Sequence, residues 1–155
     1  IIALIIYLLN KYLKSRNTNQ SEPQPEPIDP RKAHEIAYDE LEALRQKQLW
    51  QSQQFKTYYT ELTEILRRYI SNRYAIDAME QTSDDILSEF RRNKELKDKK
   101  AEIKLLNDVL QLADLVKFAK WQPLPDECER SFHQVTQFID QTKEVEPEIK
   151  NERSE

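Results

Sequence analysis

The sequence has no glycine, although 155 residues at the usual frequency of about 7% would include roughly ten. Glycine allows left-handed backbone and close approach of a ligand, so its absence excludes glycine-rich phosphate loops, dinucleotide-binding turns and nucleophile elbows. The single cysteine, Cys128, excludes an intramolecular disulfide, and the only histidines, His34 and His133, stand too far apart to suggest a zinc site. The residues therefore indicate no metal and no cofactor. The net charge of −4 is too small to select a kind of partner.

The sequence opens with an uninterrupted apolar run, Ile1 to Leu9, followed by a polar and basic flank that ends at Arg16. Nine helical residues at about 1.5 Å each cannot cross an apolar bilayer core of about 30 Å. One interpretation is a helix that packs on the domain. We favour the C-terminal part of a transmembrane helix, residues 1–16, because the run lacks an amphipathic period, starts abruptly and ends in a basic flank with tyrosines. The tyrosines suit the membrane–water interface, and the cations indicate the cytoplasmic side. The predicted membrane anchor consists of Ile1, Ile2, Leu4, Ile5, Ile6, Tyr7, Leu8, Leu9, Lys11 and Tyr12.

The rest of the sequence divides into a linker, a domain and a tail. Residues 17–29 alternate Pro23, Pro25 and Pro27 with Glu and Gln, which predicts an extended, semi-rigid spacer without a core. Residues 30–143 have the composition of a folded domain. Residues 144–155 are rich in glutamate and predict a disordered acidic tail.

Apolar residues recur at three- and four-residue steps through the domain, which predicts an all-α fold, a compact bundle of about five helices. Asp29 and Asp126 are the expected N-caps of the first and last helices, and Thr82 with Asp85 predicts a variant capping box. The fourth helix is so widely apolar that we expect it at the centre. The predicted helices run from Pro30 to about Lys47, from Ser52–Phe55 onward, from Thr82 through Phe90, from Ile103 to Ala119, and from Asp126 through Ile139.

The remaining aromatic and charged residues have mainly structural interpretations. We expect Tyr58, Tyr59, Trp50 and Trp121 to fill the core rather than to stack on bases, and Ile76 and Met79 to close its edge. With no glycine, the turns are expected to use proline, asparagine and serine. Residues 91–100 contain six positive and two negative charges, which indicates a solvated turn, with anionic lipid or nucleic acid as the functional alternative.

Few residues are candidates for chemistry. His34-Glu35 lacks the second histidine of a zincin motif, since position 38 is Tyr38, and Cys128 lies on an apolar stripe where cysteine behaves as a small hydrophobe. Asp114 falls near the edge of the polar stripe of an apolar helix, where a carboxylate needs a partner. Either it forms a structural ion pair, with Arg67, Arg68, Arg73, Lys117 or Lys120 as the candidate partners, or it belongs to a docking surface. The predicted interaction surface consists of Arg67, Arg68, Arg73, Asp114, Lys117 and Lys120.

Four segments of the domain together resemble a known family. They are PRKAHEIAYDELEALRQKQLW, YYTELTEILRRYI, MEQTSDDIL and LADLVKFAKWQPLPDE, and the likeness runs from about Pro30 to Thr142. This series is similar to the cytoplasmic C-terminal region of bacterial BatD-like membrane proteins, which belong with aerotolerance (Bat) operons that also encode MoxR-type ATPases. The joint Gln51-Ser52-Gln53-Gln54 departs from the pattern, because relatives often have a glycine at that turn.

The resemblance implies a location and a kind of partner. It places the helical domain on the cytoplasmic side of the bacterial inner membrane, after a single span. It suggests a MoxR-like ATPase or sibling Bat membrane proteins as partners, and it carries no enzymatic activity. We therefore expect a non-catalytic interaction or scaffold module that binds neither nucleic acid nor a small-molecule substrate. The alternatives are an all-α hydrolase with an acidic site and a nucleic-acid-binding helical domain, which would need a carboxylate cluster and a continuous basic face, respectively.

Overall fold

The computed structural model describes residues 31–145, which form five helices and, within that range, no strand. This confirms the predicted all-α fold for the described part of the chain. The predicted membrane anchor, the linker and most of the tail fall outside these residues. Between residues 31 and 145, none of the helices has the length and apolar character needed to span a bilayer. The helices are α2 (Ala33–Gln46), α3 (Phe55–Tyr74), α4 (Ser83–Arg92), α5 (Lys100–Phe118) and α6 (Pro125–Thr142).

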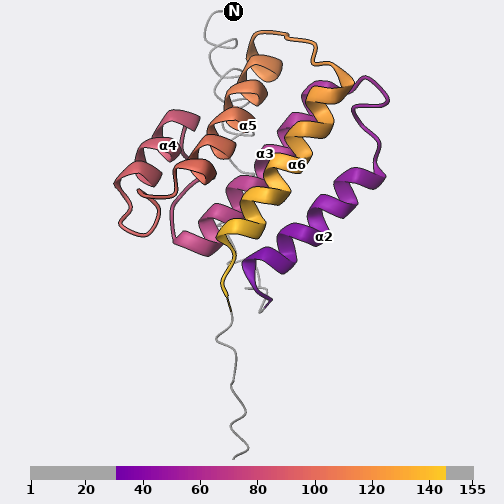
Figure 1. The fold of residues 1–155 in the computed structure, drawn as a ribbon. Helices are drawn as coiled ribbons and strands as arrows, with labels where there is room; N and C mark the ends of the chain where they lie inside the picture. The colour runs from indigo at the N-terminus through magenta and orange to yellow at the C-terminus, as the bar shows by residue number, and fades with distance from the viewer. Residues whose placement is uncertain (1–30, 146–155) are drawn as a thin grey trace, which may run out of the picture. The chain divides into compact units, whose positions relative to one another are not determined.

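Helix α3 contributes most to the core. It packs against α2, α5 and α6, and eight of its residues are buried, compared with five in α5. Figure 1 shows α6 in front of α3, with α2 on one side and α4 and α5 on the other. The expectation that α5 is surrounded by other helices is wrong on one face, where Leu115 and Phe118 are exposed. A wide apolar stripe can therefore include side chains that no neighbouring helix covers.

Tyrosine hydroxyls join α3 to α6 through the core. Tyr58, Tyr59 and Tyr69 are buried, which confirms the predicted structural role of the first two. Burial raises the pKa of all three phenols, so each stays a neutral donor. Each hydroxyl meets an oxygen of α6, and these bonds fix how α3 and α6 lie along one another. The pairs are Tyr58 with the Cys128 carbonyl at 3.0 Å, Tyr59 with the Ser131 hydroxyl at 3.1 Å, and Tyr69 with the Thr142 hydroxyl at 2.9 Å.

Two helix starts agree with the sequence prediction and three differ from it. Helix α3 begins at Phe55, within the predicted Ser52–Phe55, whereas α5 begins at Lys100 rather than at Ile103. The Thr82 hydroxyl accepts the Asp85 N–H at 3.2 Å and the Asp85 carboxylate accepts the Thr82 N–H at 3.4 Å, which confirms the predicted capping box. The first helix begins at Ala33 rather than at Pro30. The last begins at Pro125, so Asp126 lies in its first turn and is not the N-cap. Proline at the first helical position is preset for a helix, which explains this earlier start.

Two side chains assigned to the core are outside it. Ile76 is buried as expected, but Met79 and Trp121 are exposed, and Trp50 is only partly buried against the core. Leu96 differs in the opposite direction, since it is fully buried within the charged connection between α4 and α5. Periodicity could not place the other four residues because they lie in or beside connections rather than within a helix.

The turns use left-handed backbone without glycine. Between residues 31 and 145, four residues have positive φ: Gln48 at 49°, Gln53 at 61°, Ala75 at 53° and Lys120 at 57°. The expectation of proline, asparagine and serine turns is therefore wrong at these positions. A left-handed residue with a β-carbon costs about 1–2 kcal/mol, so each position carries a local penalty. One of them, Gln53, lies in the joint where the resembled family often has glycine.

Replacing Ala75 with glycine is expected to raise the free energy of unfolding by about 1 kcal/mol, because Ala75 ends α3 in the left-handed region that glycine adopts without strain. Urea denaturation of both proteins measures the change. The matched control is Ala43→Gly, at an exposed position within α2, which should lower the free energy of unfolding by about 1 kcal/mol. The same sign for both substitutions would contradict the left-handed assignment.

Candidate functional site

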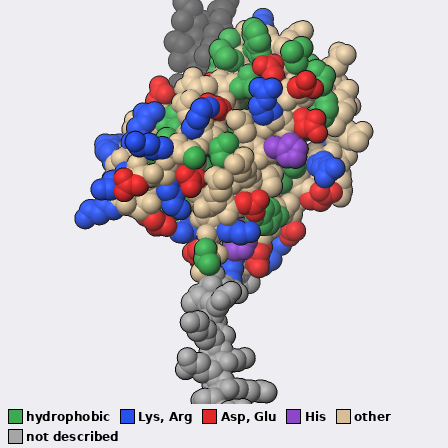
Figure 2. All heavy atoms as spheres, in the orientation of Figure 1, with side chains coloured by type: hydrophobic (Ala, Val, Ile, Leu, Met, Phe, Trp, Pro, Cys, Tyr) green, Lys and Arg blue, Asp and Glu red, His purple; other side chains and the backbone are tan. Residues whose placement is uncertain are grey.

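Large apolar side chains gather on the surface where α5 runs into α6. Within residues 31–145, six large hydrophobic residues are exposed, and four of them fall between positions 115 and 124. Figure 2 shows hydrophobic side chains at this end of the bundle, at the top of the view. Exposed large apolar residues that cluster mark binding sites more often than scattered single residues do. We call these four residues the apolar patch: Leu115 (49% exposed), Phe118 (79%), Trp121 (52%) and Leu124 (66%).

The backbone holds the apolar patch in place. Leu115 and Phe118 are three residues apart on α5 and therefore share a face. Lys120, in the left-handed region, turns the chain so that the Trp121 N–H donates to the Leu115 carbonyl at 3.2 Å. The Leu124 N–H donates to the Glu127 carboxylate at 2.8 Å, which fixes the start of α6. The patch is thus built on two helix ends and a bonded turn.

Charged residues of the predicted interaction surface flank the apolar patch. The Lys117 ammonium lies 3.5 Å from the Asp114 carboxylate and 5.5 Å from the centre of the Phe118 ring. Asp114 thus pairs with a cation of its own helix, one of the partners considered from the sequence. Lys120 is exposed and makes no ion pair within the described residues. Three of the six predicted surface residues therefore border the apolar patch.

Arg67 points into the fold instead. Its guanidinium donates to the Ala78 carbonyl at 2.8 Å and to the Gln81 carbonyl, and its second terminal nitrogen lies 3.4 Å from the Ser83 hydroxyl. Burial lowers the pKa of Arg67, and the carboxylate of Asp114 raises it. Arg67 therefore connects α3, through hydrogen bonds, to the segment that leads into α4. Its interaction with Asp114 is electrostatic and involves no hydrogen bond.

Arg68 and Arg73 also make contacts within the bundle, on two other sides of α3. Arg68 pairs with Glu40 of α2. Arg73 donates from Nε to the Thr142 carbonyl at 3.1 Å, at the end of α6, and pairs with Glu95 at 3.0 Å. The three arginines thus reach three different neighbours, so the structure does not gather them into one surface with Lys117 and Lys120.

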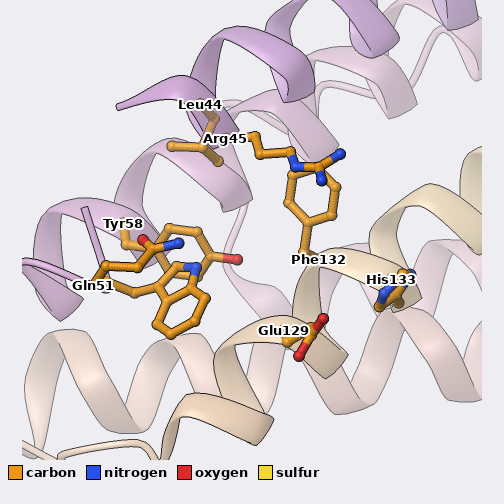
Figure 3. Close-up of a pocket in the computed structure, with 8 residues that line it drawn as sticks. Leu44, Arg45, Gln51, Tyr58, Glu129, Phe132 and His133 are labelled. Carbon is orange, nitrogen blue, oxygen red and sulfur yellow. The ribbon is translucent and has the colours of Figure 1, made fainter. Parts of the chain in front are cut away.

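A cleft of about 240 Å³ lies between the end of α2, the connection to α3, and α6. Figure 3 shows Phe132 next to Arg45 on one side, with Tyr58 and Gln51 on the other. The first cleft residue of α6, Glu129, comes five positions after Leu124, which is the N-cap of that helix. The full lining is Leu44, Arg45, Trp50, Gln51, Tyr58, Glu129, Phe132 and His133.

Residues able to do chemistry do not converge in the described part of the chain. No group of three or more His, Cys, Asp or Glu side chains there could hold a metal ion. Cys128 is buried, and burial raises the pKa of its thiol, which keeps it protonated as expected of a small core hydrophobe. The ring of His34 makes an edge contact with the ring of Tyr38, with 6.1 Å between the centroids. Tyr38 occupies the position at which a zincin motif would have its second histidine.

The apolar patch is a site that the sequence prediction missed. Leu115, Phe118 and Trp121 were assigned to the core because they are apolar and follow a helical period. The signal that could have identified them is their position, since they end one helix and lead into a proline-containing turn, after which only one more predicted helix remains to cover them. Lys117 and Lys120 of the predicted interaction surface come from the same segment, and that surface stays a prediction.

Known proteins offer no further guide to this site. No protein-family model, no curated protein and no solved structure matches the chain. The resemblance to BatD-like membrane proteins therefore stays a prediction, and the functional proposal rests on the geometry of the apolar patch.

Proposed function

We propose that the helical bundle is a non-catalytic module that binds another protein through the apolar patch. The observation that carries this proposal is the exposure of Leu115, Phe118, Trp121 and Leu124 within ten residues. Burying them in a partner removes apolar area from water, at about 25 cal/mol per Å². Tryptophan and phenylalanine are enriched in protein interfaces, and a polar rim usually surrounds them. Asp114, Lys117 and Lys120 supply such a rim.

We propose further that the module is held at the cytoplasmic face of the bacterial inner membrane. The support is in the sequence: the apolar run from Ile1 to Leu9, its basic flank and the proline-rich spacer. The resemblance to BatD-like proteins suggests the partner, a MoxR-like ATPase or a sibling Bat membrane protein. A spacer of this kind lets the apolar patch reach a soluble partner near the lipid surface.

Rigid support favours the apolar patch over the arginines as the centre of the interface. Arg67 and Arg73 already donate to backbone carbonyls within the bundle, so binding a partner through them would break bonds that hold the fold. The Phe118 side chain does not hold the fold in this way, because it is largely exposed. A partner can therefore cover it without rearranging a helix.

Replacing Phe118 with aspartate is expected to weaken binding of a MoxR-like ATPase or sibling Bat protein at least tenfold, because the partner would have to desolvate a charge at the centre of the interface. Pull-down of the chain with each purified candidate, followed by titration, measures the loss. The fold should be unchanged in circular dichroism, since the side chain is exposed.

The matched control is Met79→Asp, which places the same charge at an exposed apolar position in the connection between α3 and α4. Binding should stay within about twofold of the starting protein. Equal binding by both variants would show that the apolar patch is not the interface. If the unsubstituted chain bound no candidate, the choice of partner would be wrong.

A further inference from the structure

Residues 91–100, which we call the basic loop, concentrate the unpaired cations of the described chain. None of its six cations forms an ion pair with the described residues, whereas seven other cations do. One of its two acids, Glu95, is already paired with Arg73 of α3. Figure 2 shows Lys and Arg side chains gathered at the left edge of the view, where Figure 1 places α4 and the connection after it. The six cations are Arg91, Arg92, Lys94, Lys97, Lys99 and Lys100.

The basic loop has a fixed conformation. Leu96 is fully buried in the core and anchors its middle. The Asn93 side-chain oxygen accepts the Glu95 N–H at 2.8 Å, and the Asn93 carbonyl accepts the Lys97 N–H at 2.9 Å. The Lys99 N–H donates to the Leu96 carbonyl at 2.9 Å. A ligand that binds these cations therefore meets a backbone that is already ordered, which lowers the entropic cost of binding.

The fold accounts for only two of the six cations. Arg91 and Arg92 lie in the last turn of α4, where a positive charge is favourable to the helix dipole. Lys99 and Lys100 lie at the start of α5, where a positive charge is unfavourable. Lys97 is exposed and, like Lys94, has no side-chain partner within the described chain. No ion pair within the described residues accounts for these four lysines, and an external anion would supply the partner that they lack.

We propose that the basic loop contacts the anionic headgroups of a lipid bilayer. Lysine near an anionic membrane surface is attracted to it without needing a shaped pocket. A protein partner would need an apolar anchor, but the only large apolar residue of the loop, Leu96, is buried. A single-stranded nucleic acid would need aromatic side chains to stack on its bases, and positions 91–100 have none. This contact is separate from the apolar patch and does not depend on the partner proposed for it.

The test measures how the 155-residue chain partitions onto vesicles of phosphatidylcholine alone and onto vesicles that also contain phosphatidylglycerol. The ratio of the two partition coefficients isolates the contribution of anionic lipid, because apolar residues elsewhere in the chain contribute to both. Lys94→Gln/Lys97→Gln is expected to lower this ratio about twenty-five-fold, at about fivefold for each cation near the surface. The substituted side chains are exposed, so folding should be retained.

The matched control is Lys56→Gln/Arg130→Gln, which makes the same change in net charge at two exposed cations that have no ion pair within residues 31–145. Its ratio should stay within about twofold of that of the starting protein, since charges far from the surface are screened. An equal fall in both double variants would overturn the proposal, because net charge rather than the basic loop would explain the binding. Tighter binding to a short DNA duplex than to the anionic vesicles would overturn it in favour of nucleic acid.

Discussion

Replacing Arg67 with methionine is expected to lower the free energy of unfolding by about 3 kcal/mol. The guanidinium donates to the carbonyls of Ala78 and Gln81, which belong to the connection between α3 and α4. Hydrogen bonds from a charged donor contribute about 1.5–3 kcal/mol each, and their loss would leave half-buried carbonyls without a donor. Methionine keeps the apolar stem of the side chain, so the change reports mainly the lost bonds.

Urea denaturation of Arg67→Met and of its neighbour Arg68→Met measures the difference. Arg68 pairs with Glu40 across a partly exposed gap between α2 and α3, where an ion pair contributes about 0–1 kcal/mol. The second substitution should therefore cost at most about 1 kcal/mol. Similar losses from both would show that Arg67 does not hold the connection in the way its bonds indicate.

Adjacent arginines illustrate what the sequence could and could not predict. The buried residues of α3 follow the three- and four-residue steps expected from the sequence, because burial along a helix follows its period. Arg67 and Arg68 both fall beside that stripe and look equivalent in the sequence. They differ in what stands opposite them: Arg67 meets backbone carbonyls of a connection, and Arg68 meets a carboxylate of α2. The path of a connection is not encoded in periodicity, so a surface role and a structural role could not be separated.

The apolar patch shows that the sequence pattern also failed to separate exposed from buried apolar residues. Residues of α5 were assigned to the core because hydrophobicity predicts burial, and this holds for Leu106, Val109, Leu110, Ala113 and Val116. At about 100° per residue, Leu115 lies about 200° from Ala113, on a face that only a further helix could cover. The chain instead turns at Lys120 and leaves that face open. Sequence pattern gives the width of an apolar stripe, but the arrangement of neighbouring helices decides how much of it is covered.

Phe138→Ala is expected to cost about 4 kcal/mol of unfolding free energy, the largest loss expected from any substitution considered for this chain. Phe138 is 1% exposed, and its ring lies 6.2 Å from that of Tyr69 and 5.9 Å from that of Phe90, between centroids. The side chain therefore links α3, α4 and α6, and its removal leaves a cavity bordered by three helices that cannot all move inward. Thermal and urea unfolding both measure the loss.

The control is the same substitution at Phe118, a residue of the proposed interface, whose effect is compared with that of Phe138→Ala in the core. Phe118 is 79% exposed, so Phe118→Ala should change the free energy of unfolding by less than about 0.5 kcal/mol. Binding of the partner should weaken with Phe118→Ala, because the lost ring is the most exposed part of the apolar patch. A loss of stability close to that of Phe138→Ala would mean that the ring is packed within the fold. The apolar patch would then be part of the core, and the interface would have to lie elsewhere.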